Sequence, residues 1–226
     1  MDDYKKKFVC VIDSGHGIST ETSAKFSPKL DSNMNIPAEF CSGGRFREVR
    51  FNRVVAKDVV AILNEYGYDA RMLVTEEKED VALSTRVNRV NDICKKYGSR
   101  NVILVSVHAN ASGYGNEWNS ANGWEVWTSK GQNNSDIMAT FIFNRMKRNA
   151  PSLKMRTDYT DNDPDKESDF YIIKNANCPA CLTENCFYTN KEDLVWMTSE
   201  LGQQAIVRSH VEGIIDFINY KISKAK

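Results

Sequence analysis

The sequence predicts an α/β fold in which one mostly parallel, twisted sheet is flanked by helices on both faces, giving a single three-layer domain. Residues 102–107 form a near-continuous apolar run, which is typical of a strand that is covered on both faces. Such short runs alternate along the chain with longer segments of helical periodicity. The 226 residues, 41% of them hydrophobic and 27% charged, suit one globular domain with a proper core.

Six short segments have the apolar or alternating pattern of strands. In chain order, they are residues 8–12, 68–74, 102–107, 123–128, 170–174 and 180–183. No linker, internal repeat or low-complexity tract interrupts them. We therefore expect residues 1–226 to form one domain, without a second, separate module.

The segments between these strands carry apolar side chains at roughly helical spacing. They predict helices at residues 47–66, 81–97, 135–149 and 201–222, with a helical turn at 193–197. Gly67 and Gly98 provide stop signals for the first two helices.

Two of the three histidines follow predicted strands. His16 lies in Asp-Ser-Gly-His-Gly after the first strand, and His108 ends the strand in Asn-Val-Ile-Leu-Val-Ser-Val-His-Ala-Asn. Open α/β sheets place their ligands at this edge. Gly15 and Gly17 would permit positive φ angles and a close approach of backbone to ligand. A hydrogen-bonded strand-end residue is the simpler explanation for either histidine alone, but two equivalent positions favour a functional site.

Two carboxylates complete the candidate site. Glu48 lies in the first turn of the first helix, where it could simply complement the helix dipole. Two histidines and one carboxylate with an open fourth position are a recurring catalytic zinc set, which makes Glu48 a candidate ligand. Glu184 follows the strand at 180–183, either as a solvated acid or as the group that moves a proton. The sequence contains no HExxH motif.

These blocks, in this order, resemble the Amidase_3 type of zinc-dependent N-acetylmuramoyl-L-alanine amidase, from about Phe8 to about Tyr220. The matching segments are VIDSGHG, the glutamate at the helix start, VSVHAN and PACLTENCFYTN. The resemblance implies that His16, Glu48 and His108 bind one Zn²⁺ ion and that Glu184 is the catalytic acid and base. It also implies cleavage of the amide between N-acetylmuramic acid and L-alanine in peptidoglycan.

The sequence departs from the family at two places and leaves other functions open. Ser14 stands where the family commonly has proline, and Asn185 and Cys186 replace its usual small residues, which affects loop shape rather than chemistry. A zinc hydrolase of another amide, such as a wall endopeptidase or an N-acyl deacylase, could share the metal set. A catalytically silent wall-binding protein would be expected to lack a ligand or the base, whereas all four positions are filled.

Composition and the amino-terminal residues bear on partners and location. Lysine plus arginine equal aspartate plus glutamate at 30 each, so net charge gives no case for nucleic acid. No apolar stretch approaches the roughly 20 residues of a membrane span, and none of secretory length precedes Phe8. We expect a monomer made in the cytoplasm without a signal peptide, as in a phage or prophage endolysin. A secreted autolysin is the alternative if a signal has been removed.

Several further residues have either a structural or a functional interpretation. We expect the six cysteines to be free thiols, and Arg86, Glu125 and His210 to be structural. Residues 18–46 are expected to form one wall of the substrate groove, and residues 109–122, with Tyr114 and Trp118, are a second candidate substrate loop. The acidic stretch 157–169 lacks the glycine and terminal glutamate of an EF-hand, which favours a solvated loop at the groove rim. Glu167 remains a secondary site candidate.

Overall fold

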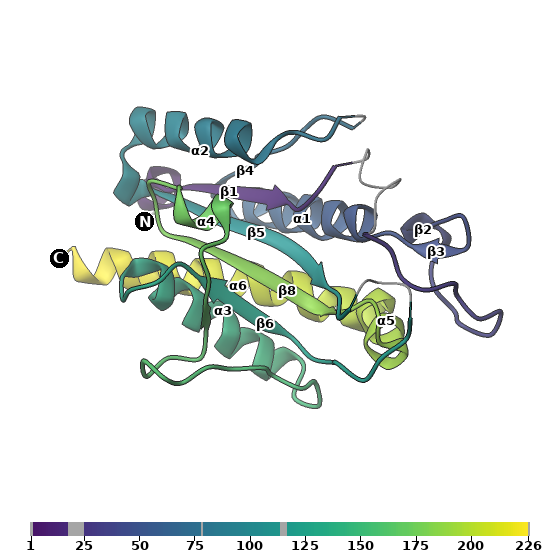
Figure 1. The fold of residues 1–226 in the computed structure, drawn as a ribbon. Helices are drawn as coiled ribbons and strands as arrows, with labels where there is room; N and C mark the ends of the chain where they lie inside the picture. Colours follow the sequence, from purple (N-terminus) through teal and green to yellow (C-terminus); the bar gives the residue numbers. More distant parts are fainter. Residues whose placement is uncertain (1, 18–24, 78, 114–116, 226) are drawn as a thin grey trace.

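The computed structural model describes residues 2–17, 25–77, 79–113 and 117–225. Six strands form one mixed, mostly parallel sheet with helices on both faces, which confirms the predicted fold class (Figure 1). The strands are β1 (Val9–Ser14), β4 (Asp69–Met72), β5 (Val102–Asn110), β6 (Glu125–Thr128), β7 (Lys166–Glu167) and β8 (Ala180–Phe187).

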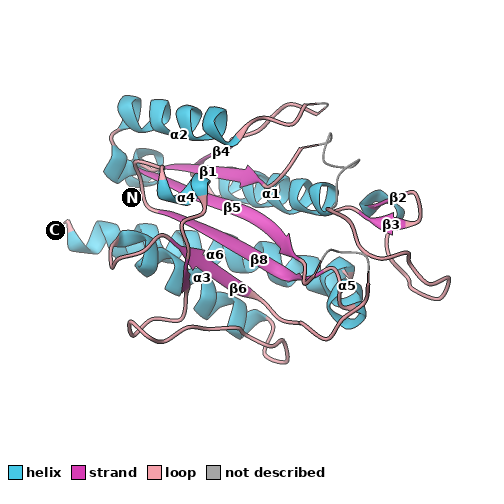
Figure 2. Cartoon of the chain, in the orientation of Figure 1, coloured by secondary structure: helices cyan, strands magenta, loops and turns pink. Residues whose placement is uncertain are grey.

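The strand order across the sheet is β4-β1-β5-β8-β6-β7. β1 pairs in parallel with β4 and β5, and β5 pairs in parallel with β8, whereas β6 runs antiparallel to β8. The carboxyl ends of β1, β5 and β8 therefore meet at one edge of the sheet, where loops gather (Figure 2). This edge is where the sequence predicts the functional site.

Two apolar cores lie on opposite faces of the sheet, because successive side chains of a strand point to opposite sides. Cys10 and Ile12 of β1 belong to the larger core, while Val9 and Val11 face the smaller one, as expected from the two-residue period of a strand. The larger core packs against α1, α3 and α6, and the smaller one against α2 and α4 (Figure 1). The helices are α1 (Glu48–Glu65), α2 (Leu83–Tyr97), α3 (Asn134–Asn149), α4 (Tyr171–Lys174), α5 (Lys191–Thr198) and α6 (Glu200–Lys224).

The structure differs from the sequence-based expectation at residues 170–174. This segment, predicted as a strand, forms the single-turn helix α4. A short apolar run does not distinguish a strand from a buried helical turn, and here the adjacent residues Ile172 and Ile173 are both buried under the sheet. The strand expected at 180–183 is also longer, because β8 continues past Glu184 to Phe187.

The long segment before α1 is only partly a loop. Residues 18–24 lie outside the described part of the chain. The remainder contains the one-turn 3-10 helix η3 (Ala38–Phe40) and a small hairpin of β2 (Cys41–Ser42) and β3 (Arg45–Phe46). Two further 3-10 turns, η1 (Asp2–Lys7) and η4 (Ser99–Asn101), precede β1 and β5.

The cysteines and the helices bear on two further expectations. All six cysteines are free, and four of them are buried among apolar side chains. Within the described residues, no helix combines the length and apolar character needed to cross a membrane.

Candidate metal centre

His16 is positioned by the turn that follows β1. Gly15 donates its backbone N–H to the Val107 carbonyl at 2.9 Å, which holds this turn against β5. The left-handed backbone, with φ of 67°, falls on His16 itself, whereas the sequence suggested the flanking glycines. Gly15 is needed for a different reason: a Cβ there would come within 2.1 Å of the His108 ring. Gly17 likewise leaves no room for a Cβ beside the Asp80 backbone, at 2.3 Å.

Glu48 is the first residue of α1 and is only 2% exposed. Asn52, one helical turn later, donates its Nδ2–H to Glu48 Oε1 at 3.3 Å and to the Gly15 carbonyl at 3.1 Å. The backbone N–H of Ala109 also donates to Glu48 Oε1, at 3.2 Å. These contacts fix the carboxylate between the two histidines.

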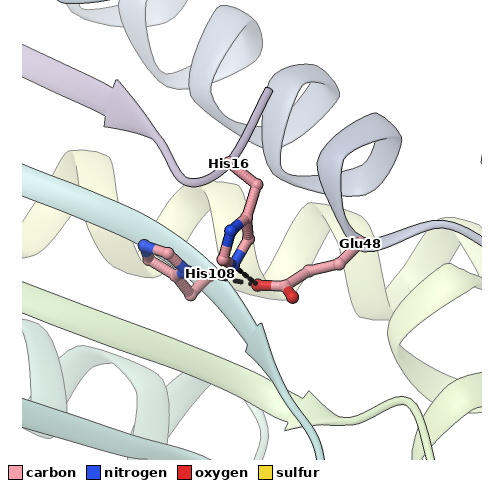
Figure 3. Close-up of side chains that lie close together, drawn as sticks. All are labelled: His16, Glu48 and His108. Atoms are coloured by element: carbon pink, nitrogen blue, oxygen red, sulfur yellow. Dashed lines mark hydrogen bonds and ion pairs between the residues drawn. The ribbon is translucent and has the colours of Figure 1, made fainter. Parts of the chain in front are cut away.

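The three side chains converge on one point (Figure 3). Glu48 Oε1 lies 3.2 Å from His16 Nε2 and 3.1 Å from His108 Nδ1. The two imidazole rings meet edge to face, with centroids 4.9 Å apart. Burial disfavours the Glu48 carboxylate, but the His16 ring and hydrogen bonds from His108 and His16 outweigh it and hold the pKa of Glu48 well below its usual value.

This donor set fits a small divalent metal ion. One donor atom from each of the three residues lies within 4.8 Å of the others. Ligands of a tetrahedral zinc ion lie about 3.3 Å apart, because Zn–N and Zn–O bonds are about 2.0–2.1 Å long. The two measured separations, 3.1 and 3.2 Å, match that edge length. Two imidazoles and one ionised carboxylate leave a fourth position open for water or substrate.

Glu184 lies beside this cluster because β5 and β8 pair in register, with Glu184 directly opposite His108. Its Oε2 atom is buried and has no hydrogen-bond partner among the described residues. Burial, followed by the charges of Glu48 and Glu125, raises the pKa of Glu184 well above its usual value. A carboxyl group in this environment has a raised affinity for a proton, which suits a group that accepts a proton and later passes it on.

A bulge immediately after Glu184 ends the regular pairing of β5 and β8. The register shifts between His108 and Asn110, and Cys186 has a left-handed φ of 71°. Asn185 bridges the distortion, because its Nδ2–H donates to the His108 carbonyl and its Oδ1 accepts from the Trp124 indole. The departure from the family pattern at Asn185 and Cys186 thus lies in a strand and shapes the bulge beside the site.

Two adjoining cavities open onto the cluster and share His16, His108, Phe170 and Leu182 in their walls. One, of 430 Å³, is also lined by Glu48, Glu184 and Tyr188 and by residues from both predicted substrate loops: Lys25, Ala109, Asn110, Ala111 and Gly113. The other, of 470 Å³, extends towards the amino-terminal end of α2. The histidines therefore lie at the junction of a groove with room on both sides.

Three other sequence candidates, Trp118, Glu167 and His210, do not line this groove. Tyr114 is outside the described residues, and Trp118 packs against the core with the Lys191 ammonium over its ring. Glu167 is exposed on β7, accepts a hydrogen bond from the Gly131 N–H and lines neither cavity. His210 is buried in α6 and hydrogen-bonded to Thr183 and the Ile206 carbonyl, a structural role as expected.

Arg86 and Glu125 are buried in ionic networks that support the site. Arg86 donates to Asp13 Oδ1 at 2.7 Å and to the carbonyls of Ser14 and His16, so it fixes the turn that carries His16. Glu125, opposite Glu184 on β6, accepts from Arg156 and Lys166. Sequence reasoning missed Asp13 and Asn52, although the i, i+4 spacing of Glu48 and Asn52 was a usable signal.

Comparisons with known proteins give a family match and two sequence relatives. Residues 10–216 match the Amidase_3 family, described as N-acetylmuramoyl-L-alanine amidase. Over 189 residues the chain is 24% identical to the endolysin of Bacillus phage SPP1, covering 79% of this chain and 64% of that protein. Over 158 residues it is 27% identical to N-acetylmuramoyl-L-alanine amidase CwlM of Bacillus licheniformis, covering 70% of this chain and 54% of that protein.

A solved structure shares the fold over nearly the whole chain. N-acetylmuramoyl-L-alanine amidase AmiC2 of Nostoc punctiforme superposes with a TM-score of 0.70 at 24% identity, covering 95% of this chain and 99% of that one. The chain spans less than two thirds of the length of the two sequence relatives.

Proposed function

Because the chain belongs to the Amidase_3 family of N-acetylmuramoyl-L-alanine amidases, we propose that it hydrolyses the amide between N-acetylmuramic acid and L-alanine in peptidoglycan. The observation that carries the proposal is the convergence of His16, Glu48 and His108 beside the buried, unpartnered carboxyl oxygen of Glu184. Amide hydrolysis needs an electrophilic site, a water and a group that moves its proton, and these residues supply places for all three.

We assign the metal as one Zn²⁺ ion, held by His16 Nε2, Glu48 Oε1 and His108 Nδ1. Nitrogen and carboxylate donors in tetrahedral spacing suit zinc better than calcium or magnesium, which prefer oxygen ligands alone. A zinc ion held there would polarise the scissile carbonyl and favour deprotonation of the attacking water.

Glu184 is assigned as the proton carrier. Its position opposite His108 puts the carboxyl group at the wall of the 430 Å³ cavity, beside the proposed ligands. Glu184 would take the proton of the attacking water and return it to the amide nitrogen as L-alanine leaves. Glu125 and Tyr188 would act on neither substrate nor water; they shape the surroundings of Glu184 from β6 and from the cavity wall.

The chain is proposed to act as a single catalytic domain on the cell wall, as an endolysin or an autolysin does. The groove has room on both sides of the histidines, which suits a polymer substrate that extends past them in both directions.

Digestion of purified peptidoglycan tests the proposal. Zinc-loaded protein is expected to release soluble peptides that begin with L-alanine, identified by mass spectrometry, and EDTA is expected to stop the release until zinc is added back. Metal-dependent cuts at another amide would replace the amidase assignment with an endopeptidase or deacylase. A zinc-loaded protein that binds peptidoglycan without releasing peptides would indicate a silent binder.

A further inference from the structure

A second group of carboxylates lies away from the groove, where α3 begins and the segment before β7 returns to the sheet (Figure 1). Asp136, in the first turn of α3, meets Asp163 and Asp165, and one oxygen atom of each lies within 4.8 Å of the others. We call these three residues the aspartate cluster. The sequence predicted a solvated acidic loop here, but Asp165 is 1% exposed and Asp136 is 4% exposed.

The aspartate cluster has fewer hydrogen-bond donors than its oxygen atoms can accept, although the Asn133 N–H donates to Asp136 Oδ2 and the Gln132 side chain donates to Asp163 Oδ2 at 3.3 Å. Thr128 Oγ1 lies 2.6 Å from Asp165 Oδ2 and 3.1 Å from Asp136 Oδ1, yet a hydroxyl has one hydrogen and serves only one of them. Asp165 Oδ1 and Asp163 Oδ1 are buried without any partner, and so is Oδ2 of the neighbouring Asp161. Ionised carboxylates accept hydrogen bonds and cannot donate them to one another.

No cationic side chain makes up the deficit. Among the described residues, no lysine or arginine forms an ion pair with Asp136, Asp163 or Asp165, although other buried acids of this chain, such as Asp13 and Glu125, do have such partners. Two buried carboxylates and a half-buried one, close together and without a cationic partner, are costly unless a cation or protons compensate for the charge.

We propose that the aspartate cluster binds a calcium ion. All available donors are oxygen atoms, which calcium prefers, and no histidine or cysteine belongs to the group. Asp163 and Asp165 of this loop, and the nearby Asp161, each have one buried oxygen without a hydrogen-bond partner among the described residues, and Asp136 completes the cluster from α3. A hollow of 600 Å³ lined by Asp136, Asp161 and Asp163 adjoins the group and gives an ion a path from solvent.

At this location the ion would have a structural role. Asp165 is followed by the two residues of β7. Lys166 donates a hydrogen bond to Glu125, and Glu167 accepts one from the Gly131 N–H. A calcium ion at the aspartate cluster would therefore fix the segment before β7 against β6 and α3. Carboxylate ligands bind calcium in their deprotonated form, so binding is expected to strengthen as the pH rises.

Calorimetric titration of the zinc-loaded protein with calcium chloride, up to about 1 mM, tests the proposal. Wild-type protein is expected to bind one calcium ion and to gain several degrees in Tm. Asp163→Asn and Asp165→Asn are expected to lose both responses, while Glu167→Gln, which removes an exposed acid just outside the aspartate cluster, keeps them. Without calcium, Asp165→Asn is expected to be at least as stable as wild type, because the repulsion is relieved.

A second variant separates calcium binding at the aspartate cluster from zinc binding at the amidase site. His16→Ala removes a proposed zinc ligand and is expected to bind calcium as wild type does, so failure of the zinc assignment would not affect the test. Absence of a calcium response in wild type at both pH 7 and pH 9 would overturn the proposal in favour of shared protons. An unchanged response in Asp163→Asn, whose side chain is only half-buried and whose loss should not prevent folding, would also overturn it.

Discussion

At the scale of single residues, the site depends on a close approach between Gly15 and the His108 ring. A methyl group at Gly15 would come within 2.1 Å of the ring, and neither the backbone of β1 nor that of β5 can move far. Strand-end positions made His16 and His108 predictable as site residues. The contact between Gly15 and the His108 ring could not be predicted, because it joins residues from two different strands. The sequence suggested that Gly15 gives the backbone a positive φ angle, whereas the structure needs a residue without a side chain there.

Gly15→Ala is therefore expected to displace the His108 ring and to weaken zinc binding by about 10- to 100-fold, the usual effect of disturbing the surroundings of a metal ligand. Competition with a chromophoric chelator measures this affinity. Ser14→Ala is the matched control, since Ser14 is buried next to Gly15 and its hydroxyl has no hydrogen-bond partner among the described residues. Equal affinities of the two variants would contradict the steric argument.

At the scale of elements, buried polar side chains connect helices to the strands that carry the site. Arg86 ties α2 to Asp13 and to the turn that holds His16, and His210 ties α6 to Thr183 of β8. Apolar periodicity predicted nearly all helices, including α2 and α6. It could not predict that β8 continues past Glu184, because the bulge at Cys186 depends on pairing with β5.

Arg86→Met is expected to lower the free energy of unfolding by about 3–5 kcal/mol, because it leaves the Asp13 carboxylate buried without its partner. Arg89→Met on the same helix is the matched control. Its ion pair with Glu76 is partly exposed to solvent on both sides and should contribute little to stability. Urea denaturation of both variants makes the comparison, and similar losses would contradict the importance of the buried pair.

The burial of His210 is expected to make the free energy of unfolding fall in acid. Burial lowers the pKa of His210 to about 4, below the value near 6.5 of an unfolded histidine. The folded state then binds fewer protons, so this contribution is complete above pH 6.5 and is lost as the pH falls towards 4. The loss amounts to about 3 kcal/mol. Urea denaturation between pH 7.5 and 4.5 should show a shallower decline for His210→Gln, and parallel curves would contradict it.

At the scale of the whole molecule, the proposed metal centre joins three separate parts of the chain. His16 follows β1, Glu48 begins α1 and His108 lies on β5, so an ion bound there links the strands to a helix on one face. The sequence predicted the layers and this convergence from strand ends. It did not predict the antiparallel placement of β6 or the aspartate cluster, because both depend on which distant segments become neighbours.

Zinc is therefore expected to stabilise the fold as a whole. An ion that binds only the native state at 1,000 times its Kd adds about 4 kcal/mol to the free energy of unfolding. Thermal denaturation should show a higher Tm after zinc is added to metal-free wild type, and no change for His108→Ala. A similar rise in the variant would place the zinc at another site.

We propose that Glu184 moves the proton while His16, Glu48 and His108 hold the metal. The most direct measurement is the rate of peptide release by Glu184→Gln, with zinc content determined on the same sample. We expect unchanged zinc and a rate that is lower by about 10²–10⁴-fold, while Glu167→Gln retains the wild-type rate. A wild-type rate in Glu184→Gln, or loss of its zinc, would contradict this division of roles.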